Sequence, residues 1–314
     1  MNMKNHWSEF WKQGHATTFG PYYKEGYQGV IGDWWEALLA QMQPGESVLD
    51  IGCGNAALLV NLLEKNSQLK YLGLDLAEVR ISPVAQEQIR NLDYPPQLFS
   101  NCPAEKIPLE NASIDTVVSV FGIEYSQCEL TLGEVSRVLK HEGRLNLLVH
   151  HRESNVTRMS KKAVDEYQEE EIESLLKALQ TIHQVIVSEG VKGLKASAVA
   201  EDSRSLVNTL ASKYLNDTDL QTANGTMFEF LNHALQFFKL IQKPAADRAD
   251  FIKNLRVEFH AYKGRFQEMV SVAKDESGIH EFQGLCKQAG IEVLECKEIY
   301  DEKGLLAWQL AGKK

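Results

Sequence analysis

The sequence lacks the features that would place a chain in a membrane or outside the cell. It has no run of eighteen apolar residues, so we expect no membrane-spanning helix. Its first residues, MNMKNHWSEFWKQGH, do not form a basic segment followed by an apolar core, so we expect no secretory signal. The cysteines are odd in number and contain no C-x-x-C pair: Cys53, Cys102, Cys128, Cys286 and Cys296. We therefore expect no disulfide framework and no zinc site, and we predict a cytoplasmic protein.

Basic side chains are also scarce relative to acidic ones. The chain has 33 Lys and Arg against 43 Asp and Glu, which gives a formal net charge of −10. Extended binding to nucleic acid is therefore not expected, because phosphates require a basic surface, although a local basic patch stays open. A hydrophobic content of 44% in 314 residues is ordinary for a globular protein and allows one domain with a large insertion.

Residues 47–57, SVLDIGCGNAA, carry most of the functional information. A short apolar strand meets Gly52 and Gly54, and a helical pattern begins at Asn55. Glycines let a ligand approach the backbone closely, and a helix N-terminus offers unpaired N–H groups. The order of strand, glycine turn and helix therefore predicts an anion- or nucleotide-binding corner.

Asp50 separates two candidate ligands for this corner. Gly52-x-Gly54-x-x-Ala57 fits the loose dinucleotide pattern, but Asp50 stands at the end of the strand. A carboxylate there would repel a pyrophosphate and would attract the positive charge of S-adenosyl-L-methionine. A second apolar strand, KYLGLD, ends in Asp75, whose carboxylate is suited to the two hydroxyls of a ribose. Together, Asp50 and Asp75 favour a ligand that carries both an adenosine and a sulfonium.

Four segments resemble the class I S-adenosyl-L-methionine-dependent methyltransferases with a type 11/25-like core: VLDIGCGNA, YLGLDLA, CPAEKIPLENASIDTVVSVFGIEY and EVSRVLKHEGRLNLL. The resemblance covers residues 45–150. It implies a set of cofactor contacts: Asp50, Gly52 and Gly54 at the methionine end, Asp75 and Leu76 at the ribose, Ala104 and Glu105 along the adenine, and Phe121 to Tyr125 facing cofactor and substrate. The sequence departs from many relatives at Pro103, where they carry an aspartate, and at Ala56, where a third glycine is frequent.

Residues 1–44 are rich in aromatic side chains and contain four of the five tryptophans. Helices are expected over 5–13 and 28–42. One interpretation packs their aromatic faces on the sheet. The other makes the segment a lid that covers the sulfonium and excludes water, with these candidate contacts: His15, Tyr22, Tyr23 and Tyr27. Both interpretations stay open, and Tyr27 is included among the cofactor-binding candidates.

Strands alternate with helices from residue 45 to residue 150. We expect strands over 46–51, 70–75, 96–100, 114–120 and 143–150, and helices over 55–65, 78–92 and 128–140. This alternation predicts a Rossmann-like, doubly wound and mostly parallel sheet of seven strands, with ligands at the carboxyl ends of the strands. Five residues then share one rim: Asp50, Asp75, Asn101, Phe121 and His150.

Three residues near this rim are candidates for removing a proton from the methyl acceptor: Tyr125, His150 and His151. Adjacent residues of a strand face opposite sides, so only one of His150 and His151 can point into the site. Tyr125 can both stack on a substrate and hydrogen-bond to it. Glu124 is expected to be a solvated or helix-capping carboxylate.

After the fifth strand, residues 152–276 give helical segments near 158–190, 197–215, 225–242 and 245–275. We interpret this insertion as a cap that builds the acceptor pocket. The rival is a homodimer interface that buries four side chains between subunits: Phe228, Phe230, Phe237 and Phe238. The alternation of helix and strand then resumes with a helix over 279–289 and two strands, IEVLECKEIY and GLLAWQLAG. Because a short turn joins these two strands, we expect an antiparallel hairpin that closes the sheet.

The sequence therefore predicts an aromatic lid (1–44), a cofactor-binding domain (45–151 and 277–314) and a helical cap (152–276). The expected activity is methyl transfer from S-adenosyl-L-methionine, which leaves S-adenosyl-L-homocysteine, to oxygen or nitrogen of a small molecule without a metal. A protein, peptide or RNA acceptor, and cofactor binding without methyl transfer, are the alternatives.

Overall fold

The computed structural model describes residues 3–18, 26–65, 68–81, 86, 89, 94–216 and 224–314. Contacts within the chain divide it into two compact units. The first comprises Met1–Ser160 and Gln267–Lys314, and the second comprises Lys161–Phe266. The insertion expected over 152–276 is wider than the second unit, because its first and last residues belong to the first unit.

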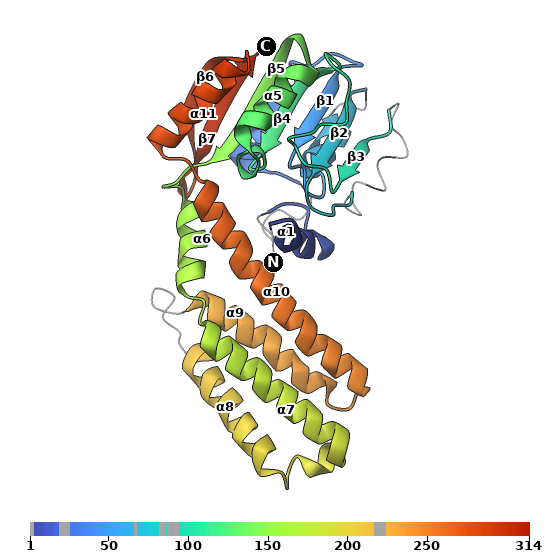
Figure 1. The fold of residues 1–314 in the computed structure, drawn as a ribbon, viewed down its shortest axis with the longest axis vertical. Helices are drawn as coiled ribbons and strands as arrows, with labels where there is room; N and C mark the ends of the chain where they lie inside the picture. The colour runs from blue at the N-terminus through green and yellow to red at the C-terminus, as the bar shows by residue number, and fades with distance from the viewer. Residues whose placement is uncertain are drawn as a thin grey trace. The chain divides into compact units, whose positions relative to one another are not determined.

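The first unit is built on a seven-stranded sheet in the order β3-β2-β1-β4-β5-β7-β6 (Figure 1). Its parallel strands are β1 (Ser47–Ile51), β2 (Lys70–Asp75), β3 (Gln97–Ser100), β4 (Ile114–Val120) and β5 (Leu139–His150). The last two strands, β6 (Glu292–Asp301) and β7 (Gly304–Lys313), form an antiparallel hairpin, and β7 pairs with β5. The doubly wound sheet with a C-terminal hairpin predicted from the sequence is confirmed.

Helices cover both faces of this sheet, as a mostly parallel sheet requires. On one face, α2 (Gly29–Leu39) and α3 (Ala57–Lys65) share a core with side chains of β1, β2 and β4. On the other face, α5 (Cys128–Val138) and α11 (Glu276–Gln288) share a second core with other side chains of β1, β2 and β4. All five residues of β1 are buried, and β2 and β4 lie on either side of it. The chain therefore reverses its strand order beside β1, which is where such sheets bind ligands.

The two N-terminal helices have different surroundings. Trp35 of α2 is fully buried in the core shared with β1, β2 and β4, so α2 packs on the sheet, and its Nε1 donates to the Leu58 carbonyl of α3 at 3.0 Å. In contrast, α1 (Met3–Lys12) joins a separate small cluster through Phe10 and Trp11, beside Cys53. The packing interpretation therefore describes α2, and α1 lies next to the glycine turn.

Two predicted boundaries differ from the structure. Residues 78–81 have no regular structure, and the rest of the helix expected over 78–92 lies outside the described residues apart from Gln86 and Ile89. β5 begins at Leu139, directly after α5, and not at 143. Its pairing with β4 shifts register between Ile114 and Thr116, so residues 139–142, which were not predicted as strand, belong to an irregular first part of β5.

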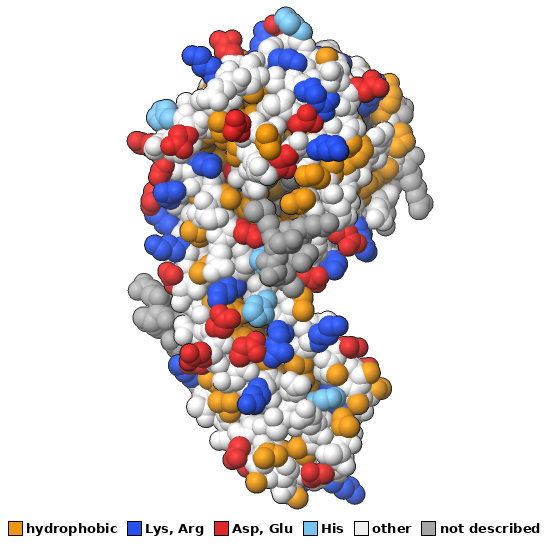
Figure 2. Space-filling view, in the orientation of Figure 1, with side chains coloured by type: hydrophobic (Ala, Val, Ile, Leu, Met, Phe, Trp, Pro, Cys, Tyr) orange, Lys and Arg blue, Asp and Glu red, His pale blue; other side chains and the backbone are white. Residues whose placement is uncertain are grey.

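The second unit is helical. It contains the end of α6 (Asn155–Asp165), α7 (Glu169–Gly193), α8 (Ala198–Leu215), α9 (Gly225–Ala234), η4 (Leu235–Leu240) and most of α10 (Ala245–Val272). Phe230 and Phe237 are fully buried in the core of this unit, whereas Phe228 is 43% exposed. The expectation that Phe230 and Phe237 lie between subunits is therefore wrong, because their own unit already buries them. Figure 2 shows acidic and basic side chains mixed over the face in view.

Each helix in the described part of the chain is too short or too polar to cross a membrane.

Candidate functional site

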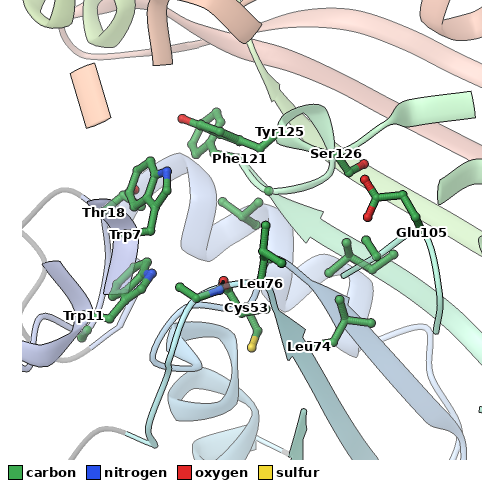
Figure 3. Close-up of a pocket in the computed structure, with 18 of the residues that line it drawn as sticks. Trp7, Trp11, Thr18, Cys53, Leu74, Leu76, Glu105, Phe121, Tyr125 and Ser126 are labelled. Atoms are coloured by element: carbon green, nitrogen blue, oxygen red, sulfur yellow. Dashed lines mark hydrogen bonds between the residues drawn. The ribbon is translucent and has the colours of Figure 1, made fainter. Parts of the chain in front are cut away.

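A pocket opens at the carboxyl ends of the central strands, between the glycine turn, the residues after β4 and helix α1 (Figure 3). It is lined by eight of the site residues predicted from the sequence: Tyr27, Gly52, Asp75, Leu76, Ala104, Glu105, Phe121 and Tyr125. The rule that ligands bind at strand ends therefore located the pocket.

Asp75 is the best-positioned acidic side chain in this pocket. Its Oδ2 accepts from the Gly54 backbone N–H at 2.9 Å, and its Oδ1 accepts from the Ala77 N–H at 2.8 Å. Burial raises the pKa of Asp75 to about 6, while these two N–H donors oppose that rise. Each carboxylate oxygen keeps a second lone pair, so both can still accept from ligand hydroxyls.

Asp50 does not line the pocket, although the sequence analysis placed it at the rim. It is 2% exposed, and Tyr71 Oη donates to its Oδ2 at 2.6 Å. Burial raises the pKa of Asp50 to about 7, and the hydrogen bond from Tyr71 opposes the rise. Asp50 and Ile51 are neighbours on a strand and face opposite sides, and it is Ile51 that reaches the pocket.

The glycines of the turn are required by contacts within the protein. Gly52 has a φ of +70°, and a Cβ on it would lie 2.6 Å from the Gly122 Cα. Gly54 has a φ of +51°, and a Cβ there would lie 2.4 Å from the Trp11 ring. Gly52 therefore lets the ends of β1 and β4 meet, and Gly54 makes room for the aromatic side chain that covers the turn.

Two tryptophans of α1 that were not among the predicted contacts also line the pocket, Trp7 and Trp11. Figure 3 shows both rings on one side of the pocket and Glu105 and Ser126 on the opposite side. Their spacing of four residues, with Phe10 between them, predicts a shared helix face and was the available signal. Of the lid contacts proposed instead, Tyr27 lines the pocket and His15 stacks on Phe10. Tyr22 and Tyr23 lie outside the described residues.

Asn55 fixes this aromatic segment to the sheet unit. Its Nδ2 donates to the backbone carbonyls of Trp11 and His15 at 3.0 and 2.8 Å, and its Oδ1 accepts from the Arg80 N–H at 3.0 Å. The side chain is 2% exposed, so these bonds are shielded from water. The residue that opens the helical pattern after the glycine turn therefore also holds the α1 segment over the pocket.

Replacing Asn55 by alanine is expected to release α1 and to weaken cofactor binding. It would leave buried carbonyl and N–H groups unpaired, at a cost of about 2 kcal/mol or more in the free energy of unfolding. Urea denaturation measures that loss, and tryptophan emission reports the exposure of Trp7 and Trp11. Gln41→Ala is the matched control, because its one amide hydrogen bond, to the Ala37 carbonyl, is exposed. Equal stability of the two variants would contradict the role assigned to Asn55.

Phe121, Tyr125 and His150 form a cluster beyond the end of β4. Phe121 has a φ of 55°, an uncommon conformation for a side chain of this size, and its ring stacks on His150 with centroids 4.4 Å apart. Tyr125 Oη lies 3.3 Å from His150 Nε2. His150 is 1% exposed, and burial lowers its pKa to about 3, so its imidazole is neutral at pH 7. His150 therefore lies behind Phe121 and outside the pocket lining.

His151 faces away from this cluster. Its ring packs on Trp308 with centroids 4.5 Å apart, its Nδ1 accepts from the Glu153 N–H at 2.9 Å, and its Nε2 lies 3.2 Å from Glu298. These contacts belong to the β7 side of β5, so we remove His151 from the candidate catalytic residues. The alternation of side chains along the strand is the reason that the two histidines separate.

Glu124 is not the solvated carboxylate expected from the sequence. It is 3% exposed, and its Oε1 accepts from the His150 backbone N–H at 2.9 Å. Burial raises the pKa of Glu124 to about 7. The expectation was wrong because η3 (Ile123–Tyr125) turns this side chain against β5 and leaves only Tyr125 facing the pocket.

The raised pKa of Asp75 predicts that cofactor affinity depends on pH. A ribose held by Asp75 would bind the ionised carboxylate, so below pH 6 binding would first have to displace a proton, and the affinity should fall as the pH falls. With a pKa of about 6, the association constant at pH 5 should be about tenfold lower than at pH 8. Calorimetric titration of S-adenosyl-L-homocysteine at pH 5, 6, 7 and 8 measures this. Asp75→Asn should remove the dependence, and a pH-independent wild type would refute it.

A doubly wound sheet of this strand order, with a glycine turn after β1 and a carboxylate at the end of β2, defines a class I S-adenosyl-L-methionine-dependent methyltransferase fold. Residues 42–212 match a family model described as a methyltransferase domain. The match covers more than half of the chain, and the protein belongs to this methyltransferase domain family, whose cofactor is S-adenosyl-L-methionine.

Solved structures resemble the chain at low identity. A methyltransferase from Methanosarcina mazei is 14% identical, covers 92% of this chain and 98% of its own, and has a TM-score of 0.41. One from Methanococcus maripaludis is 14% identical, covers 89% and 83%, and has a TM-score of 0.40. A geranyl diphosphate C-methyltransferase from Streptomyces coelicolor is 18% identical, covers 38% of this chain and 42% of its own, and has a TM-score of 0.33. The chain thus spans less than half the length of that last protein.

Proposed function

We propose that this protein transfers a methyl group from S-adenosyl-L-methionine to oxygen or nitrogen of a small acceptor. The observation that carries the proposal is that one pocket joins a carboxylate at the end of β2 to an aromatic wall beyond the end of β4. The first suits a ribose, and the second suits an organic acceptor. The cofactor supplies a methyl carbon that its sulfonium already activates.

The residues present fit the cofactor. Asp75 would accept from the ribose hydroxyls, the backbone at Gly52 would approach the methionine end, and Leu76 and Ala104 would enclose the adenine. Glu105 lies beside the adenine position, where its Oε1 accepts from the Gln127 N–H at 2.7 Å. Gly54 acts indirectly, because its N–H holds the Asp75 carboxylate in place. These assignments predict which substitutions will weaken cofactor binding.

The remaining groups of the pocket would orient the acceptor. Methyl transfer needs alignment and exclusion of water more than it needs acid–base chemistry. Phe121 and Tyr125 present a ring and a phenol toward the pocket, and Trp7 and Trp11 of α1 would act as the lid. The imidazole of His150 would position the Tyr125 hydroxyl, since it lies 3.3 Å from that oxygen.

Geranyl diphosphate, the substrate of the Streptomyces coelicolor enzyme, is not proposed as a substrate here. In the described part of the lining the charged side chains are Asp75 and Glu105, and carboxylates repel a diphosphate. The helical segment 152–276 is proposed to cap the acceptor, with a homodimer as the rival.

Calorimetric titration with S-adenosyl-L-methionine, S-adenosyl-L-homocysteine and NAD tests the cofactor, and only the first two should bind. Incubation with S-adenosyl-L-methionine and pools of small molecules, peptides or RNA, followed by mass spectrometry for a mass increase of one methylene, tests the acceptor. Binding of NAD alone would refute the proposal. Methylation of peptide or RNA alone would replace the small acceptor, and cofactor binding without any methylated product would favour a non-catalytic protein.

A further inference from the structure

The acceptor end of the pocket is an aromatic wall. The rings of Trp7 and Tyr125 meet edge to face with centroids 5.5 Å apart and planes at 88°, and Trp7 stacks along Trp11 at 6.2 Å. Phe121 continues the wall at the end of β4 (Figure 3). Asp75 stands at the end of β2, whereas Phe121 and Tyr125 follow β4, and β1 lies between these two strands in the sheet.

The electrostatics of the described lining favour a cation. Its charged side chains, Asp75 and Glu105, are both acidic, and the faces of the aromatic rings are negative. An ammonium group is attracted to such a site, whereas a carboxylate or phosphate on the acceptor would be repelled. Indole is the best of the natural side chains for holding a cation, which gives Trp7 a specific role.

The groups behind the wall also distinguish nitrogen from oxygen acceptors. An alcohol needs a base to take its proton as the oxygen attacks. Phe121 stacks on His150 and separates the imidazole from the pocket, and His150 contacts the phenol of Tyr125 instead of the pocket. Burial also keeps this imidazole neutral and a weak base. A neutral amine attacks with its own lone pair and needs no base at that step.

We propose that the acceptor is an aliphatic amine that docks its ammonium group against Trp7 and Tyr125 and is methylated on nitrogen. The inference rests on the proposed methyltransferase function. The bound ammonium first gives one proton to solvent. The nitrogen lone pair then forms the bond to the methyl carbon, the methyl–sulfur bond breaks, and its electron pair stays on sulfur. The methylated ammonium carries the positive charge that the sulfonium loses.

Three matched probes test the charge preference without turnover: 2-phenylethylamine, 2-phenylethanol and phenylacetate. Each is titrated by calorimetry at pH 7 into the full-length protein saturated with S-adenosyl-L-homocysteine. The amine should bind about tenfold more tightly than the alcohol, and phenylacetate more weakly than either. An alcohol that binds as tightly as the amine, a carboxylate that binds more tightly, or no amine binding at millimolar concentration would overturn the proposal.

Substitution of Trp7 separates cation binding from a general role in closing the pocket. Trp7→Leu should bring the amine-to-alcohol affinity ratio close to one, and Trp7→Phe should keep part of the preference. If Trp7 only closes the pocket, both probes weaken equally and the ratio stays unchanged, which overturns the proposal. If Trp7 contacts only the sulfonium, Trp7→Leu weakens the binding of S-adenosyl-L-methionine more than that of S-adenosyl-L-homocysteine. The amine-to-alcohol affinity ratio then stays unchanged, which also overturns the proposal. Cofactor titrations of the wild type test the methyltransferase function separately.

Discussion

Asp75→Ala is expected to weaken the binding of S-adenosyl-L-methionine by at least 100-fold. Two ribose hydroxyls donating to an ionised carboxylate form charge-assisted hydrogen bonds, each contributing about 1.5–3 kcal/mol. The sum corresponds to about a 100-fold loss or more, since 1.4 kcal/mol is tenfold. The same substitution also removes the acceptors of the Gly54 and Ala77 N–H groups and loosens the loop beside the cofactor. Isothermal titration calorimetry at pH 8, where the wild-type carboxyl is ionised, measures the effect.

Asp115→Asn is the control for this prediction. Asp115 lies near the start of β4, at the opposite end of the sheet, where its Oδ2 accepts from the Ser47 N–H at 2.9 Å and its Oδ1 from Lys140 Nζ at 2.7 Å. These contacts lower its pKa, although partial burial opposes them. This variant should melt at a lower temperature but bind the cofactor like the wild type. An Asp75→Ala protein that also binds like the wild type would remove Asp75 from the cofactor site.

Gly52→Ala is expected to be the most destabilising of the small substitutions near the pocket. The new Cβ would lie 2.6 Å from the backbone of Gly122, which cannot rotate away as a side chain could. Overpacking of this kind costs about 1–3 kcal/mol, and the left-handed φ of +70° adds about 1 kcal/mol for any residue with a Cβ. We expect a total loss of about 3 kcal/mol in the free energy of unfolding, with weaker cofactor binding because the ends of β1 and β4 move apart.

Gly133→Ala is the same chemical change, but we expect it to raise the free energy of unfolding. Gly133 lies inside α5, and a Cβ there would meet nothing within 4 Å. Alanine should stabilise the helix by about 0.5–1 kcal/mol, because it loses less backbone entropy on folding. Urea unfolding of both variants provides the comparison. If Gly52→Ala were as stable as Gly133→Ala, the close approach of β1 and β4 would not be what requires the glycine.

Two of the central strands were predictable because each is a short local stretch whose apolar side chains are mostly buried. KYLGLD and IDTVVSV are short apolar runs, and the structure has β2 and β4 at the predicted residues. Less local features were predicted poorly. The start of β5 depends on a register shift against β4, and the helix expected over 158–190 divides into α6 and α7. The register between two strands and the residue at which a helix ends depend on contacts with other segments, which the sequence of one segment does not specify.

The rim residues followed from the rule that strand ends meet at one edge of the sheet, but the rule does not say which way each side chain points. It therefore placed Asp75 in the pocket correctly and placed Asp50 there as well, although Tyr71 holds Asp50 inside the core. The separate expectation that Glu124 is a solvated or helix-capping carboxylate was wrong in the same way, because that carboxylate accepts from the His150 backbone N–H. The direction of these side chains is decided by the neighbouring strand.

By itself the sequence determined the class of fold, because a strand and the glycine turn after it are consecutive residues whose backbone geometry is set locally. It also predicted the cofactor correctly, through the resemblance of these segments to the methyltransferases. Only the tertiary structure decided what covers the pocket beside that turn. Trp7 and Tyr125 are far apart in the chain, and their rings meet because Asn55 ties the α1 segment to the glycine turn. A contact of that kind depends on the packing of the whole unit, since no local pattern specifies where a helix docks.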